Sequence, residues 1–148
     1  MYIDLTRQSV PSQKYRELLG TALCVFNSNN AFVIENILHT TANDYNWYEL
    51  IDIESGRLKP MIESTISKRT SNDILSLFSE IVEIRNRIIH SFQITDRDCE
   101  QRLATKTKAK DGNIQFILTE NYLIEFIKKN EQLSTKLYEY RDSLQIAI

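Results

Sequence analysis

SNDILSLFSEIVEIRNRIIHS, residues 71–91, is the stretch that decides the fold. Its first three residues, Ser71 to Asp73, are of the polar types that commonly start helices. Apolar residues then recur at helical spacing, at Ile74, Leu77, Phe78, Ile81, Ile84 and Ile88. We therefore predict an amphipathic helix that ends near Ser91 and contributes one face to a hydrophobic core.

Helical patterns also flank this stretch. Ser12 can cap a long helix that reaches about His39, with a kink or a solvent-facing turn at the polar residues 27–30. A shorter element is predicted for residues 43–54, stopped by Gly56. Pro60 suits the first turn of a helix that runs to about Lys68.

The segment after residue 100 changes character. Residues 102–110 and 113–118 have strand-like composition, and Asp111-Gly112 between them predicts a type I′ turn. Thr119 then caps a last long helix whose apolar positions continue to Leu144. Only three glycines and two prolines interrupt the chain. We predict a mainly α fold in a single domain, residues 1–148: a four- to five-helix bundle with a β-hairpin at about residues 101–118, before the last helix.

Composition limits the classes of function. The net charge of −2 gives no general attraction for nucleic acid, so any binding to RNA needs a local basic surface. Cys24 and Cys99 have no metal-type spacing, and Cys24 lies in an apolar segment where burial is expected. No apolar run approaches membrane-spanning length and no leader opens the chain. We therefore expect a cytoplasmic protein with no membrane partner.

Arg85, Asn86 and His90 are the residues of the helix that could carry chemistry. A cationic side chain is uncommon on a core-forming stretch unless it is paired or functionally needed there. Asn86 and His90 are four residues apart and lie on one face. Arg85 and His90 are five apart, about 140° around an ideal helix. Either the helix unwinds before His90, or a second copy of the helix completes the site in a two-fold dimer.

These three residue types suit the cleavage of RNA without a metal ion. A histidine can take the proton of the ribose 2′-hydroxyl or give one to the leaving 5′-oxygen. An arginine stabilises the negative phosphorane that forms in between. Asparagine can orient the histidine or the phosphate by hydrogen bonding. The products would be a 2′,3′-cyclic phosphate and a 5′-hydroxyl.

The string from Arg85 to His90 resembles the Arg-x4–6-His signature of the HEPN superfamily (higher eukaryotes and prokaryotes nucleotide-binding). A polar residue, often asparagine, follows the arginine in that family, as Asn86 does here, and His90 lies at the shortest family spacing. The order of helices is also similar, because the motif ends the penultimate helix before a long C-terminal one.

The resemblance implies a metal-independent endoribonuclease without a cofactor, acting as a toxin or as a phage-defence or stress effector. It also implies a homodimer with both motifs in one cleft, RNA as substrate, and an antitoxin or defence-system partner. Family members paired with a nucleotidyltransferase antitoxin carry a tyrosine two residues after the histidine. Phe92 stands there and has no hydroxyl, which argues against that mode of control.

Other interpretations of the same residues stay open. His90 could simply be placed where a histidine interacts favourably with the negative C-terminal end of the helix dipole. Arg85 could form an ion pair with Glu80 or Glu83. The protein would then be a non-catalytic HEPN-like module that binds RNA, a nucleotide or a partner protein, or a purely structural helical protein. The histidines and acids form no zinc or magnesium spacing, so no metal site is expected.

A second group of residues could contact the RNA backbone. Arg87 lies beside the motif, and a strand over residues 102–110 would place Arg102, Lys106, Lys108 and Lys110 on one side. An ordinary edge strand protected by lysines explains the same pattern. Three aromatic residues could stack on bases, but we expect them to pack between helices instead: Tyr45, Trp47 and Tyr48.

Overall fold

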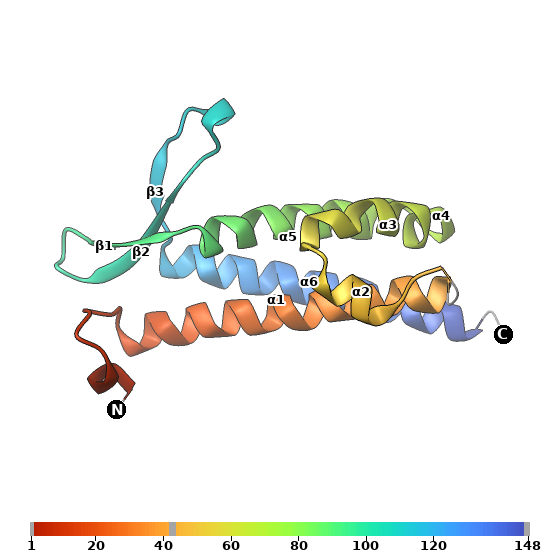
Figure 1. The fold of residues 1–148 in the computed structure, drawn as a ribbon, viewed down its shortest axis with the longest axis horizontal. Coiled ribbons are helices and arrows are strands. Elements are labelled where there is room, and N and C mark those ends of the chain that lie inside the picture. Colours follow the sequence, from red (N-terminus) through yellow and green to blue (C-terminus); the bar gives the residue numbers. More distant parts are fainter. Residues whose placement is uncertain (1, 42–43, 147–148) are drawn as a thin grey trace.

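The computed structural model describes residues 2–41 and 44–146, and three long helices dominate it (Figure 1). These are α1 (Gln13–Thr40), α5 (Asp73–Ile89) and α6 (Glu120–Ile146). Helix α6 packs against both α1 and α5, so those two helices flank it. The prediction of a mainly helical bundle is confirmed.

The ends of the long helices follow from local capping. Ser12 Oγ accepts a hydrogen bond from the Tyr15 backbone N–H at 3.3 Å and opens α1. Thr119 Oγ1 accepts one from the Tyr122 N–H at 3.1 Å and opens α6. Both predicted N-caps are therefore confirmed. Ahead of α5, Ser71 Oγ accepts from the Asp73 N–H at 3.3 Å.

Short helices connect α1 to α5 and cover part of one side of the bundle (Figure 1). They are α2 (Trp47–Asp52), the 3-10 helix η2 (Ser55–Leu58), α3 (Lys59–Ser64) and α4 (Ile66–Arg69). The element predicted for residues 43–54 corresponds to α2 and is shorter than predicted. Its expected start at residue 43 lies outside the described residues. Gly56 falls inside η2 rather than stopping a helix.

The helix predicted from Pro60 to Lys68 is interrupted at Thr65. The Thr65 hydroxyl donates to the Met61 carbonyl at 2.6 Å, and the Thr65 N–H bonds Ile62 O instead of continuing the α-helical ladder. A threonine side chain can compete with the backbone in this way. The uninterrupted helix was therefore a wrong prediction.

A three-stranded antiparallel sheet separates α5 from α6, in the order β1 (Phe92–Thr95), β2 (Gln101–Lys106), β3 (Gln115–Ile117). Ala104 faces Phe92 on one side and Ile117 on the other. The predicted hairpin corresponds to β2 and β3, whereas β1 was not predicted. Residues 105–117, called the arm below, rise away from the helices (Figure 1).

The turn at the tip of the arm differs from the predicted type I′ turn at Asp111-Gly112. Asp111 ends a short 3-10 helix, η3 (Ala109–Asp111). The two left-handed residues are Gly112, with φ 96°, and Asn113, with φ 53°. Glycine and asparagine are the types that adopt this conformation most readily, so the turn is shifted by one residue.

Polar side chains are buried in the middle of the bundle. Asn29 Nδ2 donates to Asn130 O at 2.8 Å and to Asn130 Oδ1 at 3.0 Å, and Ser134 Oγ donates to Asn29 Oδ1 at 2.6 Å. Ser55 Oγ donates to Asn30 Oδ1 at 2.8 Å. Helix α1 runs unbroken through residues 27–30. Asn27 and Ser28 face solvent, as one of the two predicted alternatives has it, whereas Asn29 and Asn30 find partners inside the core.

The predicted burial of Cys24 is also wrong. Cys24 is exposed, while Ala22 and Phe26 are buried. A residue two positions from both lies about 200° around the helix from each of them, on the solvent side.

Tyr15 joins the sheet to the bundle. Its side chain is fully buried, and its hydroxyl donates to Leu118 O at 2.6 Å while accepting from the Leu103 N–H at 3.2 Å. The Arg102 guanidinium lies over its ring, 5.0 Å from the centroid. Burial raises the pKa of Tyr15, so the hydroxyl stays protonated and can donate.

We expect Tyr15→Phe to lower the free energy of unfolding by about 1–2 kcal/mol, because it leaves the buried Leu118 carbonyl and Leu103 N–H without their partner. Urea unfolding followed by circular dichroism measures this. Tyr48→Phe removes the same atom from an exposed ring and serves as the matched control, with an expected change below about 0.5 kcal/mol. Equal effects of the two substitutions would contradict the role given to Tyr15.

Candidate functional site

Arg85 lies on the side of α5 that faces α1. It is half-buried, its guanidinium lies 5.2 Å from the centroid of the Phe26 ring, and its Nη1 donates to Asn86 Oδ1 at 3.2 Å. It helps to line a cavity of about 260 Å³ together with Phe26, Asn30 and Ser55. The structure therefore brings Arg85 and Asn86 together.

The acids proposed as partners of Arg85 are bound to lysines instead. Glu80 Oε1 lies 2.6 Å from Lys129 Nζ, and Glu83 Oε2 lies 2.8 Å from Lys108 Nζ. A salt bridge of Arg85 to Glu80 or Glu83 was therefore a wrong alternative. Stacking on Phe26 and the hydrogen bond to Asn86 hold the guanidinium in place of an ion pair.

His90 follows the last residue of α5. Its backbone N–H donates to Asn86 O at 3.0 Å, so the helical hydrogen bonding continues as far as His90 and the helix does not unwind before it. The side chain is exposed, and its imidazole makes no hydrogen bond to any residue that the structure describes. The cavity that Arg85 lines does not include His90. The described structure thus does not bring His90 into the cavity beside Arg85.

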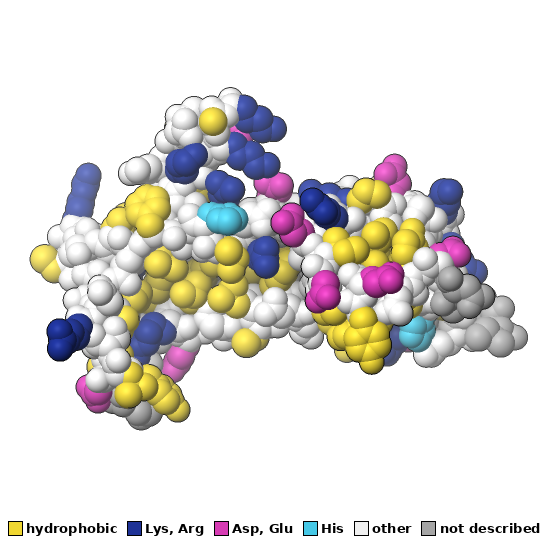
Figure 2. Space-filling view, in the orientation of Figure 1, with side chains coloured by type: hydrophobic (Ala, Val, Ile, Leu, Met, Phe, Trp, Pro, Cys, Tyr) yellow, Lys and Arg dark blue, Asp and Glu magenta, His cyan; other side chains and the backbone are white. Residues whose placement is uncertain are grey.

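The surface around the end of α5 is partly apolar. Ile89 is 47% exposed and Phe92 is 42% exposed. Figure 2 shows apolar side chains gathered along the furrow between α1 and α5, with a histidine side chain over the sheet end of α5 on the same face. Exposed apolar residues grouped in this way commonly mark a surface that another molecule covers.

Arg87 points to the other side of α5, toward the arm. Its Nη1 donates to Lys106 O at 2.8 Å, and its Nε is buried without a hydrogen-bond partner among the described residues. Together with Lys108, Lys110, Phe116 and Tyr122 it lines a cleft of about 520 Å³ between α5, the arm and α6, called the arm cleft below. The sequence pattern predicted Arg87 near RNA but gave no sign of this cleft.

The basic strand face predicted for residues 102–110 is not formed. Strand β2 ends at Lys106, and Arg102 turns inward over Tyr15. Lys106 Nζ donates to Asn113 Oδ1 at 2.6 Å and does not line the arm cleft. Lys108 and Lys110 come together with Arg87 because the chain folds back at η3.

An ion pair ties the arm to α5. The Lys108 ammonium hydrogen-bonds Glu83 and holds the pKa of that carboxyl below its usual range. A lowered folded-state pKa means that the pair stabilises the protein above the ordinary pKa of a glutamate. This stabilisation is lost as the pH falls through the folded-state pKa.

We expect the pKa of Glu83, followed by carbon-detected NMR titration, to rise toward its ordinary value in Lys108→Met because the hydrogen bond to the carboxylate is gone. Lys110→Met removes a charge from the same cleft without breaking the pair, and we expect it to change the Glu83 pKa less. The same Glu83 titration midpoint in wild type and Lys108→Met would contradict this assignment.

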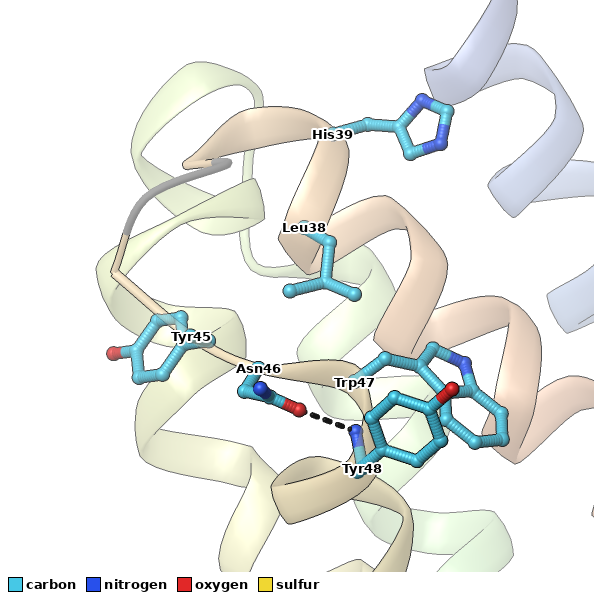
Figure 3. Close-up of a pocket in the computed structure, with 6 residues that line it drawn as sticks. All are labelled: Leu38, His39, Tyr45, Asn46, Trp47 and Tyr48. Carbon is cyan, nitrogen blue, oxygen red and sulfur yellow. Dashed lines mark hydrogen bonds between the residues drawn. The ribbon is translucent and has the colours of Figure 1, made fainter.

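The aromatic residues after α1 form a separate surface (Figure 3). Trp47 and Tyr48 are exposed and meet edge to face, with ring centroids 5.5 Å apart, so packing between helices was a wrong prediction for these two. Tyr45 is half-buried. Figure 3 shows His39 and Tyr45 pointing in different directions, so the lining side chains do not converge on one ligand.

No family model, characterised protein or solved structure matches the chain. The resemblance to HEPN proteins therefore rests on the string from Arg85 to His90 and on the order of the helices. Within residues 2–41 and 44–146, no group of three or more His, Cys, Asp or Glu side chains is placed to hold a metal ion. No helix in that part of the chain has both the length and the apolar character needed to cross a bilayer.

Proposed function

We propose that the protein is a HEPN-like endoribonuclease that acts in the cytoplasm as a homodimer. Arg85, Asn86 and His90 form the working set and need no metal ion. The reaction is attack of the ribose 2′-hydroxyl on the adjacent phosphate, which releases a 5′-hydroxyl and leaves a 2′,3′-cyclic phosphate. Such an activity suits a toxin or a phage-defence or stress effector held in check by an antitoxin or another partner.

The observation that carries this proposal is the exposed imidazole of His90 beside the exposed Ile89 and Phe92. An exposed imidazole can exchange protons with a bound RNA. An apolar rim gives a second copy a surface to cover. A two-fold arrangement of this rim would bring the His90 of one copy toward the Arg85 of the other, which one chain alone does not do.

Each residue then has a distinct role. His90 moves the proton of the attacking hydroxyl or of the leaving oxygen. Arg85 stabilises the charge on the phosphorane, and its stacking on Phe26 limits the positions that the guanidinium can take. Asn86 accepts from Arg85 Nη1 and fixes the orientation of the guanidinium fork.

A second candidate function is a non-catalytic module that binds RNA, a nucleotide or a partner protein. The contacts of Arg85 favour it, because Phe26 and Asn86 already hold the guanidinium and the cavity that it lines does not include His90. In this case Arg85 would stabilise the packing of α5 against α1 rather than a transition state.

Incubation of the purified protein with total RNA in excess EDTA distinguishes the two functions. The ribonuclease proposal expects fragments whose 5′ ends accept phosphate from polynucleotide kinase without prior phosphatase treatment. It also expects 3′ ends that resist ligation until the cyclic phosphate has been opened and removed to leave a free 3′-hydroxyl. Intact RNA, together with a monomer in gel filtration with multi-angle light scattering, would favour the binding module.

A further inference from the structure

The arm cleft combines an aromatic wall with basic side chains. Phe116 on β3 and Tyr122 on α6 form the wall, with ring centroids 5.9 Å apart and planes at 55°. Burial raises the pKa of Tyr122, so its phenol stays neutral and can donate a hydrogen bond. A volume of about 520 Å³ is in the range of pockets that hold small ligands.

The charges of the cleft are unevenly matched. Three cationic side chains, those of Arg87, Lys108 and Lys110, face two acids, Glu83 and Asp111. The pair between Lys108 and Glu83 neutralises one of each. Arg87 has a buried Nε with no partner among the described residues, although its Nη1 is bound to Lys106 O. A buried donor without a partner is costly, so an incoming acceptor at this place is favoured.

An aromatic wall next to unpaired cations suits a nucleotide. The base can lie against aromatic rings, as in most recognition of single-stranded RNA, and the phosphate can take the arginine. Glu83 could accept a hydrogen bond from an amino group of the base. A duplex presents its bases stacked and paired, so only an unstacked base could enter a cleft of this size.

The position of the cleft on α5 relates it to the proposed reaction. Arg87 and His90 are three residues apart and are neighbours on the helix surface, about one turn from each other. Arg85 lies two residues before Arg87, about 200° around the helix, on the side of α1. A nucleotide held by Arg87 would therefore lie about one helical turn from His90, which does not itself line the cleft.

We propose that the arm cleft binds one unstacked nucleotide of single-stranded RNA, with its base against Phe116 and Tyr122 and its phosphate on Arg87 and Lys110. This inference rests on the proposed function, for which it names the substrate class and a nucleotide-binding subsite.

Fluorescence anisotropy with a labelled 2′-O-methyl hexanucleotide of mixed sequence tests the proposal. This probe lacks the attacking hydroxyl, so binding is measured apart from cleavage. We expect Phe116→Leu and Arg87→Gln each to weaken binding about tenfold, through lost stacking and a lost phosphate contact. Lys110→Gln is expected to weaken it severalfold, and the matched control Lys106→Gln, on the same arm but outside the cleft, less than twofold.

The outcomes separate this proposal from the ribonuclease proposal. Binding that depends on Phe116 supports the cleft even if no RNA is cleaved. Equal losses of RNA affinity in Lys106→Gln and Lys110→Gln, with no effect of Phe116→Leu, would indicate diffuse charge attraction. This result would overturn the proposal that the cleft binds RNA. A probe displaced equally well by an equimolar mixture of the four nucleoside monophosphates would identify a free nucleotide as the ligand and overturn the RNA part.

Circular dichroism identifies any variant that fails to fold. Phe116→Leu and Lys110→Gln change different elements of the cleft. If one of these variants fails to fold, the RNA affinity of the other can still be compared with that of Lys106→Gln. If the remaining folded variant binds the probe as strongly as Lys106→Gln does, the proposal that the cleft binds RNA is overturned. Weaker binding supports the proposal.

Discussion

Arg85→Ala and His90→Ala are each expected to lower the rate of RNA cleavage by at least about 100-fold. A mixture of the two variants in equal amounts is expected to recover about a quarter of the wild-type rate. The loss follows from removing the charge on the phosphorane or the group that moves the proton. The recovery follows because the cavity that Arg85 lines does not include His90. Each site would then take its arginine from one copy and its histidine from the other.

The expected recovery follows from counting sites. Random pairing makes half of the dimers mixed, and one of the two sites in a mixed dimer receives both native side chains. The rate of RNA cleavage after mixing, unfolding and refolding measures it. Recovery near zero, with both variants folded and dimeric, would contradict a composite site.

A dominant-negative experiment gives an independent measurement. A chain that carries both substitutions, added to an equal amount of wild type, is expected to halve the wild-type rate because it occupies half of the native partners. If each chain were sufficient by itself, the rate would stay unchanged. The same experiment with a double variant of exposed residues, Asn27→Ala with Ser28→Ala, provides the control, because this chain keeps both catalytic side chains.

Asn29→Ala is expected to lower the free energy of unfolding by about 3 kcal/mol, the largest loss of stability that we predict for a polar residue. The substitution removes the hydrogen bonds to Asn130 and Ser134 and leaves their polar atoms buried without that partner. It also opens a small void between α1 and α6. Urea unfolding followed by circular dichroism measures the change.

Asn27→Ala is the matched control for this experiment, because Asn27 lies half a turn away on the exposed side of the same helix. We expect it to change the free energy of unfolding by less than about 0.5 kcal/mol. A double-mutant cycle of Asn29→Ala with Ser134→Ala is expected to show coupling of about 1 kcal/mol, since the two side chains share a hydrogen bond. Additive effects would mean that the network does not contribute as described.

Features fixed by neighbouring residues could be predicted from the sequence. Ser12 and Thr119 cap helices through bonds to N–H groups three residues ahead. The apolar spacing of α5 likewise depends only on its own residues. Strand β1 was missed because its alternation of apolar and polar residues spans only four positions, Phe92 to Thr95, and the strand is defined by its pairing with β2.

The surroundings of the candidate site depend on contacts between distant segments. Nothing near Arg85 in the sequence indicates that Phe26, on another helix, lies under its guanidinium. The arm cleft forms only because the hairpin leans toward α5 and places Lys108 opposite Glu83. The sequence thus identified residues that could act, but their neighbours are set by the angle between the arm and the bundle.

The attachments of the arm differ in strength. Tyr15 holds its root through buried hydrogen bonds, whereas the exposed pair between Lys108 and Glu83 is the ion pair at its tip. Amide protons near the tip will therefore exchange with deuterium through a local opening that costs far less than unfolding of the helices. Added salt weakens an exposed pair, so it will speed that exchange and leave the protection of the helices unchanged. The bundle can thus remain rigid while the tip of the arm opens and closes on its own.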